Sequence, residues 1–129
     1  MTTNYFKNDY VEIRVQDEII FMKCLNDIDL PKAKKIAEER LKIHNGNSMP
    51  VIVFGYKSRC FSREALKYLS KDDGIRHISV GALVVDNPVH RFIANFFLTI
   101  DKPEVKTKVF NTESEAVAWC KKQKYTDKK

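Results

Sequence analysis

The stretch from His77 to Phe110 constrains the fold more than any other part of the chain. Its first part, residues 78–85, is almost unbroken apolar sequence, which is typical of a strand covered on both faces. A polar cap and Pro88 then predict the start of a helix over residues 88–100. Residues 105–110 predict a second strand. A strand, a crossover helix and a second strand in this length form a βαβ unit, so we expect the two strands to pair in parallel.

The helix predicted over residues 88–100 has one face of large apolar side chains. They recur at the three- and four-residue spacing of one helix face: Val89, Phe92, Ile93, Phe96, Phe97 and Ile100. Two interpretations are open. The face is the core side of a crossover helix, or it is a movable cover or membrane-facing surface that Leu98 extends. Because only Arg91 and Lys102 bring positive charge near it, the core interpretation is favoured.

The remaining sequence predicts a β-hairpin followed by alternating helices and strands. Residues 10–16 alternate between apolar and polar side chains, and residues 19–25 form the return strand after a turn at Asp17 and Glu18. The later elements are a helix between Asp29 and Gly46, a strand over 50–54, a helix over 63–70 capped by Ser62, and a last helix that starts at a capping box of Thr112 and Glu115. The predicted fold class is α/β, with a mixed, mainly parallel five-stranded sheet and about four helices.

The helix that follows Asp29 is expected to have one buried and one solvated face. The buried face groups Ala33, Ile36, Ala37, Leu41 and His44. The solvated face groups Lys32, Lys34, Lys35, Glu38, Glu39, Arg40 and Lys42. The last helix is expected to pack Ala116, Val117, Trp119 or Cys120 inward.

Length and composition indicate one domain over residues 10–122, between an N-terminal tail, 1–9, and a basic C-terminal tail, 123–129. A chain of 129 residues and 15.0 kDa buries a core without a metal or a disulfide. Three cysteines, an odd number, favour reduced thiols. No secretory signal and no apolar run of membrane-spanning length is present, so a cytoplasmic location is expected.

The net charge of +6 is concentrated at the C-terminus. The nine residues that begin at Lys121 hold +4, and the other 120 residues hold only +2. A short basic end is more often solvated than bound to phosphate, so no nucleic-acid partner is expected.

No catalytic or cofactor-binding motif stands out. His44, His77 and His90 share no metal-ligand spacing, and nothing in the sequence places them beside Cys60 or Asp86 as a nucleophile and base. The four glycines form no phosphate-binding pattern. We therefore expect neither an enzyme nor a cofactor.

An ordered set of segments carries a resemblance to a known family. These segments are residues 50–53, 62–65, 82–91, 95–98 and 110–119. In this order the chain resembles the anti-sigma-factor antagonist fold, the STAS domain, and more closely the small bacterial SpoIIAA-like proteins, which are often compared with CRAL-TRIO lipid-binding domains. The resemblance spans most of the chain from Tyr10 to Lys122 and implies a binding or regulatory module.

One departure from the family pattern concerns phosphorylation. The partner-switching antagonists carry an Asp-Ser-Ser-Gly signature whose serine is phosphorylated, and here the corresponding residues are 62–65, Ser-Arg-Glu-Ala. Counting from the preceding strand puts Glu64 at the acceptor position, and a carboxylate cannot be phosphorylated in that way. The nearby Ser62 is explained by its role as a helix cap.

Two functional hypotheses follow. The first is a non-enzymatic regulatory or protein-interaction module of the anti-sigma-factor-antagonist type, without the serine switch. The second is a carrier or sensor of a small apolar ligand, or a module in peripheral contact with a membrane; a homodimer is a further possibility. The candidate ligand or partner surface comprises Ser58, Cys60, Ser62, Phe92, Phe96, Phe97 and Leu98.

Overall fold

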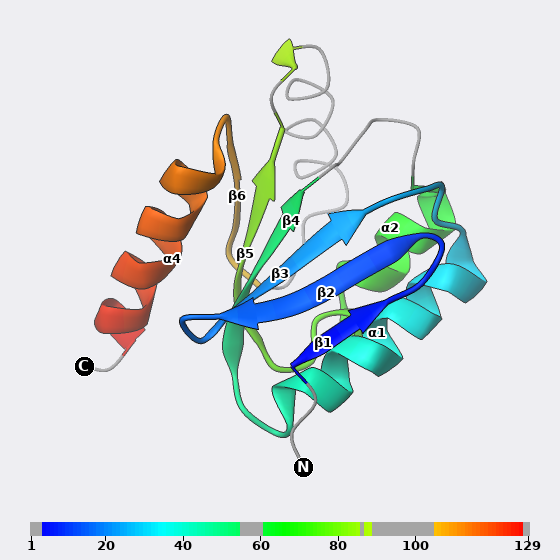
Figure 1. Ribbon diagram of the computed structural model, residues 1–129, viewed down its shortest axis with the longest axis horizontal. Helices are drawn as coiled ribbons and strands as arrows, with labels where there is room; N and C mark the ends of the chain where they lie inside the picture. Colours follow the sequence, from blue (N-terminus) through cyan, green and yellow to red (C-terminus); the bar gives the residue numbers. More distant parts are fainter. Residues whose placement is uncertain (1–3, 55–60, 86, 89–104, 128–129) are drawn as a thin grey trace.

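The computed structural model of the chain describes residues 4–54, 61–85, 87–88 and 105–127 (Figure 1). The strands are β1 (Tyr5–Lys7), β2 (Val11–Gln16), β3 (Ile19–Cys24), β4 (Met49–Phe54), β5 (Ile78–Val84) and β6 (Thr107–Phe110). The helices are α1 (Leu30–His44), α2 (Arg63–Leu69), the short 3-10 helix η1 (Asp72–Gly74) and α4 (Glu113–Asp127).

One six-stranded sheet forms the middle layer, in the order β1-β2-β3-β4-β5-β6. The pairs β1–β2 and β2–β3 are antiparallel, and the three later pairs are parallel. Helices α1 and α2 pack on one face, and α4 packs on the other (Figure 1). The predicted α/β class with a mixed, mainly parallel sheet is confirmed, although the prediction had five strands.

The additional strand is β1, which lies in the stretch assigned to the N-terminal tail. Tyr5 pairs with Arg14, and Lys7 pairs with Glu12. The side-chain oxygen of Asn8 accepts hydrogen bonds from the two backbone N–H groups at positions 10 and 11, which closes the turn into β2. A strand of three residues is too short for apolar alternation to reveal, so sequence periodicity missed it.

The predicted hairpin of β2 and β3 is confirmed. Its two turn residues, Asp17 and Glu18, have φ values of 54° and 65°. Two successive residues with positive φ make the turn whose twist matches that of the flanking strands. Because side chains alternate along both strands, Val11, Ile13, Ile20 and Met22 face α1, and Glu12, Arg14, Phe21 and Lys23 lie on the α4 face.

Helix α1 starts and ends where the sequence predicts. The Asp29 side chain accepts a hydrogen bond from the backbone N–H of Lys32, and Asn45 ends the helix in the left-handed conformation with φ 50°. The predicted division of its faces is partly wrong. Glu39 and Arg40, expected in solvent, are buried at 8% and 1% exposure, while Leu41 is only half-buried. Both charged groups find partners that the sequence pattern does not show, as described below.

The βαβ unit is confirmed in its pairing. Gly81 of β5 pairs in parallel with Thr107 of β6, as a crossover between them requires. Val80 and Ala82 are buried towards α4, where they pack with Ala116 and Cys120 as expected. The predicted helix over 88–100 lies almost wholly outside the described residues.

The capping box at the start of α4 is also present. The Thr112 hydroxyl accepts a hydrogen bond from the backbone N–H of Glu115 at 3.2 Å and donates to the Glu115 carboxylate at 3.0 Å. The predicted reach of Glu115 back to the cap therefore ends on the threonine hydroxyl. Helix α4 continues to Asp127, through most of the stretch that the sequence assigned to a C-terminal tail.

Candidate functional site

The first turn of α2 holds the one predicted surface residue that the structure describes. The Ser62 hydroxyl oxygen accepts a hydrogen bond from the backbone N–H of Ala65 at 3.1 Å. The backbone N–H of Ser62 donates to the carbonyl of Ile28 at 2.9 Å, and Phe61 forms a parallel bridge to the same residue. The prediction that Ser62 caps this helix is therefore confirmed, and the segment after β3 fixes its position.

The outer side of α2 is charged and exposed. Arg63, Glu64 and Lys67 are exposed, whereas Ala65 is fully buried against the α1 layer. Glu64 stands in the first turn, where the helix dipole favours a negative charge. This turn therefore exposes charges of both signs, those of Arg63 and Glu64.

The other predicted surface residues are Ser58, Cys60, Phe92, Phe96, Phe97 and Leu98, and they lie outside the described residues. The ligand-carrier hypothesis depends on the last four of them. It therefore stays a prediction from sequence.

A buried arginine joins α1 to the segment before β5. The Nη1 atom of Arg40 donates to the carbonyl of Arg76 at 2.8 Å, and Nη2 donates to the carbonyls of Asp73 and Gly74, both at 3.2 Å. Burial lowers the pKa of Arg40 to about 10, and the group remains a cation at neutral pH. Three backbone carbonyls thus satisfy this buried charge, which is a stabilising role and not a catalytic one.

His44 completes this polar cluster. Its Nε2 lies 2.7 Å from Nη1 of Arg40, and its Nδ1 lies 3.0 Å from the carbonyl oxygen of Asn47. Because a guanidinium can only donate, Nε2 must accept and Nδ1 must carry the proton. Burial, reinforced by the positive charge of Arg40, lowers the pKa of His44 to about 4. The structure also brings the ring of His77 to 5.9 Å from that of His44, a proximity that the sequence did not predict.

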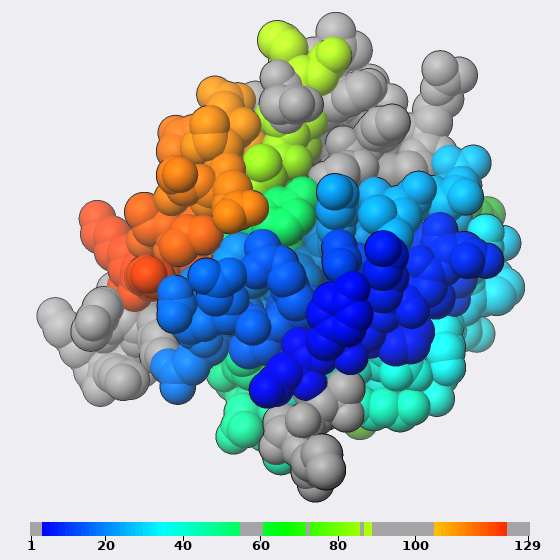
Figure 2. Space-filling view, in the orientation of Figure 1, coloured from blue at the N-terminus to red at the C-terminus, as the bar shows by residue number. Residues whose placement is uncertain are grey.

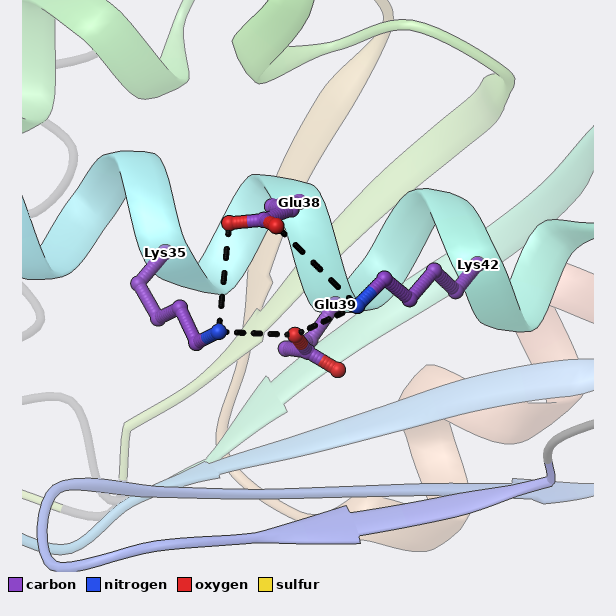
Figure 3. A network of polar contacts seen from close by, with 4 residues as sticks. All are labelled: Lys35, Glu38, Glu39 and Lys42. Carbon is purple, nitrogen blue, oxygen red and sulfur yellow. Dashed lines mark hydrogen bonds and ion pairs between the residues drawn. The ribbon is translucent and has the colours of Figure 1, made fainter.

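A second charged cluster lies on the outer side of α1 (Figure 3). Glu39 Oε2 is 3.0 Å from Nζ of Lys35 and 3.1 Å from Nζ of Lys42, and Glu38 makes longer contacts with the same two lysines. Burial alone would raise the pKa of Glu39, but the two lysine hydrogen bonds outweigh it and hold the pKa below its ordinary value. The cluster explains how a carboxylate is tolerated at a nearly buried position. Within the described part of the chain, no group of three or more His, Cys, Asp or Glu residues could hold a metal ion.

Two adjoining hollows lie beside α4 on the α4 face of the sheet, over β2 and β3. The first, of about 430 Å³, is lined by Glu12, Arg14, Phe21, Lys23, Phe54, Val84 and Glu113. The second, of about 460 Å³, is lined by Gln16, Asp17, Ile19, Phe21, Glu113, Ser114, Val117, Ala118 and Lys121. In Figure 2 the blue side chains of the N-terminal strands lie at the surface beside the orange residues of α4. We call the two hollows together the α4 groove; sequence reasoning did not find it.

Comparison with known proteins identifies the fold and the family. No curated protein matches the chain in sequence. The fold is similar to that of an uncharacterized protein from the DUF3478 family with a SpoIIAA-like fold, from Shewanella loihica PV-4. The TM-score is 0.57 at 12% sequence identity, over 85% of this chain and 91% of that chain. This likeness confirms the SpoIIAA-like architecture that the sequence resemblance implied.

Two further findings bear on the class of protein. No helix in the described part of the chain has the length and apolar composition needed to cross a membrane. Residues 13–124 match the family described as Domain of unknown function (DUF7793). This range contains most of β2, all of β3 to β6 and most of α4. The chain therefore belongs to the DUF7793 family.

Proposed function

We propose that this protein is a non-enzymatic regulatory module of the anti-sigma-factor-antagonist type, which binds a protein partner through the first turn of α2. In this proposal, binding does not depend on phosphorylation of a serine in that turn. The SpoIIAA-like fold supports the general class, because the antagonists that the sequence resembles carry their regulated serine in this turn.

The observation that carries the proposal is the arrangement around Ser62. Its hydroxyl accepts the hydrogen bond from Ala65, so the serine has a structural role that phosphorylation would disturb. Glu64, which stands at the acceptor position of the family, is exposed and offers a carboxylate that needs no phosphorylation. A partner that binds this carboxylate would therefore find the same surface whether or not a kinase is active.

The charges that flank Glu64 indicate that such a partner carries complementary charges. Arg63 and Lys67 are exposed on either side of Glu64 in sequence and lie on the same short helix. Charged groups at the edge of an interface contribute mainly to specificity and association rate. Reversing the charge of Glu64 should therefore weaken binding without unfolding the protein.

Affinity capture from the cells that make the protein tests the proposal. The parent chain, Glu64→Lys and the control Asp9→Lys, an equal charge change at an exposed turn between β1 and β2, are compared by quantitative mass spectrometry. We expect a partner that the parent and the control retain and that Glu64→Lys loses. Equal recovery of every captured protein by all three forms would contradict the proposed surface.

Phosphopeptide mapping of the same material tests the absence of a serine switch. We expect the peptide that contains Ser62 to be unmodified whether or not the partner is bound. A phosphate on Ser62 that changes with partner occupancy would refute this part of the proposal and leave the interaction surface itself standing.

A further inference from the structure

One side of α4 is exposed along the α4 groove while the opposite side is in the core. The groove side comprises Glu113, Ser114, Val117, Ala118 and Lys121, whose spacings of three and four place them on one helix face. All of them are exposed except Val117, which is half-buried. Ala116 and Cys120, both fully buried, hold the other side of the helix against the sheet. The exposed side is therefore displayed on a fixed helix.

The charges on this side are arranged symmetrically about its centre. Glu113 stands at one end and Lys121 at the other, with Val117 and the small residue Ala118 between them. Eight residues of helix separate the two charges by about 12 Å. If a second α4 lies antiparallel to the first with its centre at the same place, each Glu113 lies opposite a Lys121 of the other helix. The stripe is thus complementary to itself under a two-fold axis.

The side chains at the centre permit a close approach. Ser114 and Ala118 are one turn apart and short, and packed helices need small or interdigitating residues to reach the usual axis separation of about 8–10 Å. Val117 adds an apolar contact at the axis. A larger or charged residue at position 118 would hold two such helices apart.

The polar residues at the hairpin end of β2, next to α4, add to the exposed surface of the stripe. Stable dimers bury on the order of 800 Å² on each partner, which requires more than one pair of helix stripes. The floor of the groove, Ile19 and Phe21 of β3, is only 2% and 5% exposed, so the additional area comes from the exposed side chains of Gln16 and Asp17 on its rim. The guanidinium of Arg14 lies 4.3 Å from the centre of the Phe21 ring and forms the adjoining wall.

From this arrangement we infer that the α4 groove binds α4 of a second copy of this chain, antiparallel and about a two-fold axis near Val117 and Ala118. Each Glu113 then pairs with Lys121 of the other copy. Lys121 already lies 3.9 Å from Asp17 of its own chain, but the two side chains are 52% and 67% exposed. Such an exposed pair contributes little to stability, so Lys121 is available to the second copy.

Sedimentation equilibrium of the full chain, from micromolar to millimolar concentration, tests the inference. The parent chain should approach twice its mass of 15.0 kDa as concentration rises. Glu113→Lys alone and Lys121→Glu alone should each remain near the monomer mass, because each places like charges opposite each other at both ends of the interface. Ala118→Arg should do the same by putting two charges at the axis.

Mixing the two single variants separates this interface from any other. In a mixed pair, Lys at position 113 meets Glu at position 121, and the unchanged Glu113 meets the unchanged Lys121, so the dimer mass should return. The double variant should dimerise by itself for the same reason. Lys122→Glu, an equal charge change at the next, exposed position of α4, should behave as the parent does. Circular dichroism and the melting temperature establish that every variant is folded.

Two results would overturn the inference: a parent chain that stays monomeric to millimolar concentration, or a dimer that persists in both single variants. The inference is independent of the proposed function, which depends on α2. The capture experiment with Glu64→Lys does not measure the mass of the protein in solution. A parent chain that proves monomeric would leave the capture result, and hence the proposed function, unaffected.

Discussion

Arg40 Nη1 lies 2.7 Å from Nε2 of His44, and both side chains are 1% exposed. The contact exists only while the imidazole is neutral, since a protonated ring would set a donor against a donor. The Arg40 cation also disfavours a second charge nearby. The end of α1 is therefore sensitive to acid in a way that can be measured.

The first prediction is that stability decreases as pH falls from 6.5 to 4. Because the folded state holds the pKa of His44 near 4, below its ordinary 6.5, the unfolded chain takes up a proton first. The loss should reach about 3 kcal/mol at pH 4 and not increase further from this group. Glutamine does not titrate, so the free energy of unfolding of His44→Gln should change less with pH. The difference in slope should correspond to at most one proton taken up on unfolding. The free energy of unfolding is measured by urea denaturation at each pH. If it changed with pH by the same amount in the parent and in His44→Gln, the assignment to His44 would be wrong.

Replacing Arg40 should be costly despite its place on a charged stretch of helix. Arg40→Met leaves the carbonyls of Asp73, Gly74 and Arg76 without their donor, and we expect a loss of about 3 kcal/mol. Lys34→Met, at an exposed position of the same helix, should change stability by less than about 0.5 kcal/mol. Urea midpoints of the two variants decide the matter, and equal midpoints would show that the carbonyl contacts are unimportant.

Gly74 should tolerate no side chain. A Cβ at this position would overlap the carbonyl oxygen of Tyr68, which is backbone and cannot move aside alone. Gly74→Ala should therefore destabilise by at least about 2 kcal/mol. Gly46 offers a comparison, since a Cβ there meets nothing within 4 Å but φ is +81°, so Gly46→Ala should cost only about 1 kcal/mol. Thermal unfolding should rank the two variants in this order.

Ser62→Ala should lower stability by about 1 kcal/mol, the usual loss for a helix N-cap. Ser62→Asp, whose carboxylate can accept the same hydrogen bond from Ala65, should restore most of it. Chemical denaturation of the three proteins checks this. A loss in the alanine variant that aspartate does not recover would assign the serine a different role.

Phe92 and Phe96 lie outside the described residues, and the sequence alone predicts their behaviour. If their stripe is core, truncation of either to alanine should cost about 3–5 kcal/mol. If the stripe covers an apolar ligand or meets a membrane, stability should change by less than about 0.5 kcal/mol and liposome binding should weaken instead. Urea denaturation and liposome flotation distinguish the two, and we expect the first outcome.

The predictions that succeeded rest on local signals. Asp29, Ser62 and Thr112 cap their helices through hydrogen bonds that reach only three residues along the chain. The hairpin turn and the parallel pairing of β5 with β6 likewise follow from short sequence patterns. Sequence was sufficient where the partners are close neighbours or where, as for β5 and β6, a continuous strand-helix-strand pattern connects them.

The predictions that failed concern contacts between residues that are far apart in the sequence. The carbonyls that bind Arg40 are 33 to 36 residues away along the chain, so a charged helical repeat gave no reason to bury it. The α4 groove joins β2, β3 and α4, and no single segment carries its signal. Helical periodicity does place Glu113 and Lys121 on one face, but only the sheet topology shows what lies beside that face.

Strand β1 decides where the protein can be shortened. It pairs with residues 12–14 of β2, and without it this stretch would be an unpaired sheet edge next to the buried side chains of Val11 and Ile13. A fragment cut at residue 10, the boundary that the sequence suggested, or at residue 13, where the family match begins, would expose this edge. Such fragments are expected to aggregate on expression, so a preparation intended for crystallisation has to retain Tyr5–Lys7.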